Sequence, residues 1–75
     1  MSKPLYQAYY RVNKETKEKE YLSINMFATP PIEWVPQVEK ADKYSNYDTF
    51  LNNAKVFNLE IETDKYDYDF EEVGR

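Results

Sequence analysis

The chain has 75 residues, no cysteine, no histidine, a single glycine and a formal net charge of −4. A chain of this length forms at most one domain, so we expect residues 1–75 to be a single domain with an acidic C-terminal segment at 64–75, whose order the sequence leaves open. The absence of cysteine excludes disulfides and thiolate metal sites, and the single glycine, Gly74, excludes glycine-rich phosphate-binding loops.

Neither a signal peptide nor a membrane span is predicted. The N-terminal letters MSKPLYQAYY lack the apolar core of a signal peptide. No apolar run approaches the roughly 20 residues needed to cross a bilayer. We therefore expect a soluble cytoplasmic protein that makes no membrane contact.

The negative charge is concentrated at the C-terminal end. Residues 1–57 contain eight Lys or Arg and seven Asp or Glu, whereas residues 58–75 contain two and seven. Because acidic side chains repel the phosphate backbone, we expect no direct contact between this end of the chain and nucleic acid.

The N-terminal half is predicted to form a β-hairpin. Residues 5–12 (LYQAYYRV) and 21–27 (YLSINMF) are rich in strand-forming residues. The wholly polar letters NKETKEKE between them indicate a solvated turn. We expect Tyr10 to lie in the core and Tyr9 on the sheet surface.

The middle of the chain is predicted to contain a short edge strand and one helix. Residues 32–35 lie between prolines, which suits an edge strand, and residues 37–44 are expected to include one helical turn. A longer helix is predicted over 46–57, with Ser45 as its N-cap and Asn58 as its C-cap. Its apolar face has the spacing of a helix and comprises Tyr47, Phe50, Leu51, Ala54 and Phe57.

Another strand is predicted at 59–62 (LEIE). The apolar positions are odd up to Ile61 and even from Tyr66, so YDYDF (66–70) is either a bulged continuation of that strand or a separate short strand. These elements predict an α+β fold: a small antiparallel sheet of three or four strands with one amphipathic helix packed on one face. The predicted core comprises Tyr10, Val12, Leu22, Ile24, Trp34, Phe50, Leu51, Ala54, Phe57, Leu59 and Ile61.

Little catalytic chemistry is available to the chain. Without histidine or cysteine it lacks the commonest general base and the strongest nucleophile, so we expect no enzyme activity, no catalytic residue and no cofactor. Asp67, Asp69 and Glu71 form an alternating set of hard oxygen ligands suited to calcium or magnesium. The glycine and the bidentate glutamate of an EF-hand loop are missing, so a charged strand face is favoured and no metal site is predicted.

The stretch ETDKYDYDFEEV, residues 62–73, alternates acidic and aromatic side chains. On a rigid strand, regularly spaced carboxylates resemble a row of phosphates, and the rings supply contact area. A solvated sheet face that runs into a frayed terminus has the same composition, so both interpretations stay open. The candidate partner-binding residues are Glu60, Glu62, Asp64, Tyr66, Asp67, Tyr68, Asp69, Glu71 and Glu72.

The order of motifs resembles a type of small early protein encoded by phages and prophages of low-GC Gram-positive bacteria. The resemblance covers residues 9–62 and rests on the hairpin YRVNKETKEKEYLSI, a Trp, ADKY, a helix with NNAKVF, and LEIE. Proteins of this type include stoichiometric inhibitors of a host enzyme or defence system. The long NKETKEKE tip and the acidic C-terminal extension depart from the type, so the resemblance implies no role for the extension.

Three functions fit these patterns. The leading one, in line with the resemblance, is a non-enzymatic phage protein of the bacterial cytoplasm that inhibits a host nuclease, CRISPR effector or other nucleic-acid-handling protein. It would act as an anti-CRISPR or anti-restriction protein whose acidic, DNA-mimicking surface occupies the partner's basic groove. The alternatives are a structural or assembly protein that self-associates through a sheet edge, and a single-strand nucleic-acid binder that uses Tyr9, Tyr10 and Arg11. The partner's identity, and whether the chain is a monomer or a homodimer, are left open by the sequence.

Overall fold

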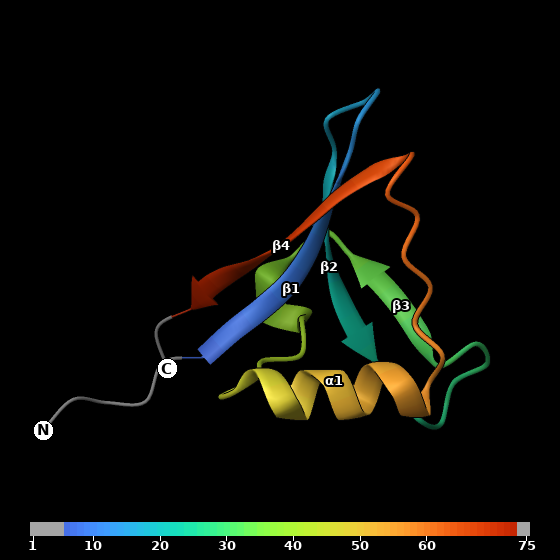
Figure 1. Ribbon diagram of the computed structural model, residues 1–75, viewed down its shortest axis with the longest axis vertical. Helices are drawn as coiled ribbons and strands as arrows, with labels where there is room; N and C mark the ends of the chain where they lie inside the picture. Colours follow the sequence, from blue (N-terminus) through green and yellow to red (C-terminus); the bar gives the residue numbers. More distant parts are fainter. Residues whose placement is uncertain (1–5, 74–75) are drawn as a thin grey trace, which may run out of the picture.

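Four antiparallel strands and one α-helix make up the computed structural model, which describes residues 6–73 (Figure 1). The strand order across the sheet is β3-β2-β1-β4. The last element of the chain, β4, therefore lies at one edge of the sheet, beside β1. The helix α1 lies on one face of the sheet, where its Phe50 joins the main core. This architecture confirms the predicted α+β fold.

The N-terminal hairpin forms as predicted. β1 spans Tyr6–Asn13 and β2 spans Lys19–Ile24; residue 5, the first of the predicted strand, lies outside the described residues. In the turn, the Oδ1 of Asn13 accepts hydrogen bonds from the backbone N–H groups of Glu15 and Thr16 at 2.8 and 3.0 Å. Asparagine commonly organises turns in this way, so one side chain shapes the polar tip.

β2 ends at Ile24, before the predicted limit at Phe27. Asn25 turns the chain there, because its Oδ1 accepts a hydrogen bond from the backbone N–H of Phe27 and its carbonyl accepts one from Ala28, both at 3.0 Å. The side chains of Met26 and Phe27 are consequently 67% and 90% exposed, and they take no part in the core.

The predicted edge strand and helical turn are both present. β3 spans Ile32–Val35 and pairs antiparallel with β2, and a single 3-10 turn, η1, spans Val38–Lys40. The residues that follow η1 are anchored to the sheet by Asp42, because its Oδ2 accepts a hydrogen bond from the N–H of Ile24 at 2.8 Å. As a result, Ala41 is buried against the sheet.

The helix α1 spans Tyr47–Val56, within the predicted 46–57, and its N-cap is Asn46 rather than Ser45. The Oδ1 of Asn46 accepts hydrogen bonds from the backbone N–H and the hydroxyl of Thr49, at 2.8 and 3.0 Å, and so satisfies a free donor of the first turn. At the other end the C-cap is Phe57 rather than Asn58. Asn58 follows it with a φ of 55°, the left-handed conformation that asparagine tolerates after a helix.

The contact between α1 and the sheet is narrower than predicted. Phe50 is 5% exposed and Ala54 packs against the same cluster. Tyr47 and Leu51, which were expected on the inner face, are 59% and 37% exposed. The helix therefore rests on the sheet along a stripe centred on Phe50 and Ala54. Tyr47 lies at the margin of this stripe, where its ring centroid is 5.9 Å from that of Phe70 on β4.

The strand predicted at 59–62 does not form. These residues are an irregular segment, and the N–H of Glu62 donates to the hydroxyl of Tyr68 at 3.0 Å instead of to a neighbouring strand. The place beside β1 is taken by β4, Tyr66–Val73, because β4 pairs with β1 along all 8 of its residues. YDYDF is thus part of a separate strand, one of the two predicted alternatives. Ile61, expected in the core, is 46% exposed.

Tyr9, and not Tyr10, faces the helix, so the prediction for these two residues is wrong. The pairing register sets Tyr10 opposite Tyr21. Because side chains alternate across a strand, this register places Tyr9 on the same face as Leu22. Tyr9 is 8% exposed, and its ring centroid lies 4.5 Å from that of Phe50. Tyr9 is therefore at the centre of the main core.

A second, smaller cluster lies on the opposite face of the sheet. Ala8, Tyr21 and Ala41 are buried there, and Tyr10 packs against them. Val12, also expected in the main core, belongs to this second face because it alternates with Arg11 and lies opposite Lys19. Elements thus pack against both faces of the sheet: α1 on one, and the segment around η1 over part of the other.

Candidate protein-binding surface

The acidic and aromatic residues of β4 lie on opposite faces of the sheet, because alternate side chains of a strand point in opposite directions. The rings of Tyr68 and Phe70 have centroids 5.8 and 4.9 Å from that of Tyr9, so they belong to the main core. The residues on the α1 side are Tyr66, Tyr68, Phe70 and Glu72, and those on the other side are Asp67, Asp69 and Glu71. The predicted surface of mixed acids and rings is therefore divided by the sheet.

Glu71 is engaged by two residues of β2. It forms a salt bridge with Lys19 and accepts a hydrogen bond from the hydroxyl of Tyr21 at 2.9 Å. Both interactions favour the ionised carboxylate, so the hydrogen bond from Lys19, followed by that from Tyr21, lowers the pKa of Glu71. The hydrogen bond with Glu71 likewise raises the pKa of Lys19. Glu71 therefore links β4 to β2 and is less available to a partner than sequence reasoning expected.

Asp67 and Asp69 share the face of Glu71 but are exposed. The Nζ of Lys14 lies 3.9 Å from the Oδ1 of Asp67, whose side chain is 77% exposed; a pair this open to water is weak. The Oδ1 of Asp69 accepts a hydrogen bond from the backbone N–H of Phe70 at 2.8 Å. Both carboxylates keep oxygen atoms accessible to a cationic partner.

Glu60, Glu62 and Asp64 are exposed on the irregular segment that leads from α1 into β4. The Oε1 of Glu62 lies 3.7 Å from the Nζ of Lys65, and its backbone carbonyl accepts hydrogen bonds from the N–H groups of Lys65 and Tyr66, both at 3.0 Å. These two bonds close the turn that contains Asp64. The turn holds the acids of this segment next to the start of β4.

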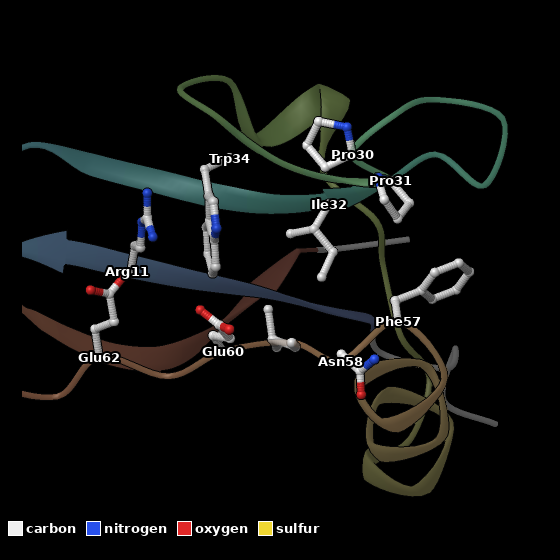
Figure 2. Close-up of a pocket in the computed structure, with 10 residues that line it drawn as sticks. Arg11, Pro30, Pro31, Ile32, Trp34, Phe57, Asn58, Glu60 and Glu62 are labelled. Carbon is white, nitrogen blue, oxygen red and sulfur yellow. The ribbon is translucent and has the colours of Figure 1, made fainter.

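A groove of about 290 Å³ lies between this segment and β3 (Figure 2). Its apolar lining includes Ile32, Trp34 and Leu59, and the side chains of Glu60 and Glu62 line it from the segment. The groove is assembled from residues far apart in the chain, so the sequence offered no signal for it. It places two of the predicted partner-binding acids beside apolar surface.

Arg11 is held within the fold rather than presented to solvent. Its guanidinium carbon lies 4.2 Å from the ring centroid of Trp34 and 4.0 Å from that of Tyr66. Its Nε donates to the Oε1 of Glu20 at 3.0 Å, and the side chain is 15% exposed. The faces of the two rings and the carboxylate of Glu20 together stabilise the guanidinium cation of Arg11.

Tyr9, Tyr10 and Arg11 do not form a shared surface for stacking on nucleic-acid bases. Tyr9 is buried under the helix, whereas Tyr10 lies on the opposite face of the sheet. Arg11 is occupied by Trp34 and Glu20. The geometry therefore gives no support to single-strand binding through these three residues.

In residues 6–73, no group of three or more His, Cys, Asp or Glu side chains is placed to hold a metal ion. Asp67, Asp69 and Glu71 do share a face, but the carboxylate of Glu71 is bound to Lys19. In the same part of the chain, no helix has the length and apolar character that crossing a membrane requires.

The exposed carboxylates around β4 are named the acidic edge: Glu60, Glu62, Asp64, Asp67, Asp69 and Glu72. Comparison of the chain with protein-family models, with curated proteins and with solved structures found no match in any of the three. The geometry of the acidic edge and the resemblance of residues 9–62 are therefore the available grounds for a function.

Proposed function

We propose that the protein is a non-enzymatic inhibitor that uses its acidic edge to bind a basic, nucleic-acid-binding surface of another protein. The observation that carries the proposal is that these carboxylates remain exposed along β4 and the segment before it, whereas Glu71 alone is half-buried. Complementary charge would speed association with a basic groove and disfavour acidic partners. As the resemblance to phage proteins implies, the proposed partner is a host nuclease, CRISPR effector or related defence protein.

The carboxylates of the acidic edge form a band that includes both sides of β4, rather than the single row expected from the sequence. Asp67 and Asp69 lie two residues apart on one strand, a spacing of about 6.8 Å. Glu60 and Glu62 lie on the segment that lines the groove beside Trp34. A basic surface that surrounds the edge strand would meet carboxylates from both sides of β4.

Self-association through β4 is the competing proposal, because no second strand among residues 6–73 pairs with the outer side of β4. Antiparallel pairing of two copies about the middle of β4 would, however, set Asp67, Asp69 and Glu71 of one copy against those of the other. Like charges directly opposite each other destabilise a sheet, and charged residues on edge strands commonly prevent such pairing. The geometry therefore favours a basic partner over a second copy.

The test is capture of a partner from a lysate of a low-GC Gram-positive host with tagged protein, followed by measurement of that partner's nucleic-acid binding. The acidic-edge variant carries Asp64→Asn, Asp67→Asn, Asp69→Asn and Glu72→Gln, and spares Glu71 because Glu71 supports the fold. A control with the same charge change elsewhere carries Glu15→Gln, Glu18→Gln, Glu33→Gln and Glu39→Gln, all at exposed positions.

We expect the native chain and the control to capture the same partner and to inhibit its binding to nucleic acid, and we expect the acidic-edge variant to do neither. Equal capture by the variant and the control would contradict the proposal. So would a captured partner whose nucleic-acid binding is unchanged by the native chain.

A further inference from the structure

The outer side of β4 presents main-chain groups in a defined pattern. The N–H of Lys14 donates to the carbonyl of Lys65 at 3.0 Å, in register with the β1–β4 ladder. In an antiparallel pair, successive residues alternately point both main-chain groups toward the neighbouring strand and away from it. The residues of β4 that point both groups outward are therefore Tyr66, Tyr68, Phe70 and Glu72.

Two local hydrogen bonds occupy part of this outer side. The N–H of Tyr66 donates to the carbonyl of Glu62 at 3.0 Å, which marks the beginning of the open edge. The N–H of Phe70 donates to the Oδ1 of Asp69 at 2.8 Å, so the side chain of Asp69 occupies the middle of the edge. From Tyr68 to Glu72, no other strand among residues 6–73 covers it.

The side chains that flank this edge differ between the two faces. Asp67 and Asp69 are exposed on one face, and the half-buried rings of Tyr68 and Phe70 lie on the other. A strand added to β4 would therefore place alternate side chains near carboxylates and near rings. Charge complementarity selects a basic strand for this position, and the same carboxylates oppose a second copy of β4.

We propose that β4 accepts an extended segment of the partner protein as a fifth strand, in which Lys or Arg alternates with apolar residues. This inference rests on the proposed function and specifies its binding mode. The basic side chains would pair with Asp67 and Asp69, and the apolar ones would lie beside Tyr68 and Phe70. When this strand docks, the carboxylate of Asp69 releases the N–H of Phe70 and pairs with a basic side chain of the partner. The N–H of Phe70 then donates to a main-chain carbonyl of the added strand.

The test uses the full chain and a short synthetic peptide in which lysine and valine alternate, with binding followed by fluorescence anisotropy. In antiparallel addition, the residues opposite Tyr68 and Phe70 are the valines, and they direct their N–H groups at β4. N-methylation of the valines is therefore expected to weaken binding at least about tenfold, because each methyl group removes a ladder hydrogen bond. The matched control is the peptide N-methylated at its lysines, which keeps the positive charges and the main-chain hydrogen bonds to β4. This peptide is expected to bind within about twofold of the parent peptide.

An asymmetry between the two methylated peptides supports main-chain pairing, and loss at the valines identifies the antiparallel orientation. Amide hydrogen exchange at Tyr68 and Glu72 should slow when the parent peptide binds, because their N–H groups point outward. Equal binding or equal loss for the two methylated peptides would overturn the inference. Failure of the parent peptide to bind would overturn it as well.

A charge variant separates failure of this inference from failure of the proposed function. At a concentration where light scattering shows each variant to be monomeric, Asp67→Asn with Asp69→Asn should weaken binding of the parent peptide about tenfold, whereas Glu33→Gln with Glu39→Gln should leave it unchanged. If the parent peptide binds both variants equally, the acidic edge and the proposed function fail together. If binding needs the aspartates but ignores N-methylation, strand addition alone is wrong.

Discussion

The hydroxyl of Tyr21 on β2 donates a hydrogen bond to the carboxylate of Glu71 on β4 at 2.9 Å, across the strand β1 that separates them. Lys19 forms a salt bridge with the same carboxylate. Together these contacts tie the edge strand to the centre of the sheet. They also distinguish Glu71 from the neighbouring acids, which remain exposed to solvent.

Replacement of Glu71 should weaken the fold. Glu71→Gln removes the salt bridge with Lys19, and we expect the free energy of unfolding to fall by about 1 kcal/mol, since the pair is partly exposed. Glu72→Gln changes the same charge at an exposed neighbour and should have almost no effect. Urea unfolding followed by the fluorescence of Trp34 measures both. Equal stability of the two variants would show that the contacts of Glu71 contribute nothing.

The contribution of Glu71 should also depend on pH. Its pKa is lowered from the ordinary value of 4.5, chiefly by the hydrogen bond from Lys19. The native state therefore binds this proton less readily than the unfolded state, so the stabilisation is present above pH 4.5 and is lost as the pH falls through the lowered pKa. Glu71→Gln should lose less stability than the native chain on acidification. Parallel stability curves below pH 4.5 would contradict this.

Arg11 should not be replaceable by lysine. Arg11→Ala removes a guanidinium that lies over Trp34 and Tyr66 and that bonds Glu20, with an expected cost of about 1–2 kcal/mol. Arg11→Lys should restore less than half of it, because an ammonium lacks the planar group that stacks between two rings. Urea unfolding provides the measurement, and Lys14→Ala is the control. Full restoration by lysine would show that charge alone matters.

The N-cap of α1 can be assigned by a pair of substitutions. Asn46→Ala should lower the free energy of unfolding by about 1 kcal/mol, because it removes the acceptor for the N–H of Thr49. Ser45→Ala should change it by less than about 0.5 kcal/mol, since that residue is exposed and precedes the cap. Thermal unfolding followed by circular dichroism compares them. A larger effect at Ser45 would reverse the assignment.

The acids of β4 should keep the chain monomeric. Asp67→Asn with Asp69→Asn removes like charges that would face each other if two copies paired through β4. We therefore expect this variant to associate at concentrations where the native chain does not. Light scattering over a concentration series measures this, with Glu15→Gln and Glu18→Gln as the control. A native dimer, or a monomeric variant, would contradict the prediction.

Local patterns were sufficient to predict several elements. The hairpin, the edge strand at 32–35 and the helix Tyr47–Val56 each follow from residues close together in sequence. The faces of β1 could not be predicted, because adjacent tyrosines, Tyr9 and Tyr10, give both faces an apolar character. Only the pairing of β1 with β2 decides which ring faces the helix.

The site was predictable in composition but not in arrangement. Both LEIE and YDYDF have the alternation of a strand, and β4 prevails because it pairs with β1 over its whole length. The acids are evident near the C-terminal end of the sequence, yet Glu71 and its partner Lys19 are 52 residues apart in the chain. No local pattern could reveal that Glu71 stabilises the fold while Asp67 and Asp69 stay exposed.

The affinity of the captured partner, measured as salt is raised, tests the role of the acidic edge most directly. We predict that the native chain binds the partner much more weakly as salt is raised, because exposed charges are screened. The control variant, with Glu15, Glu18, Glu33 and Glu39 replaced, should show the same steep dependence. The acidic-edge variant should bind more weakly at low salt and respond little to salt. Identical salt dependence for the variant and the control would show that the acidic edge is a solvated surface and that the partner binds elsewhere.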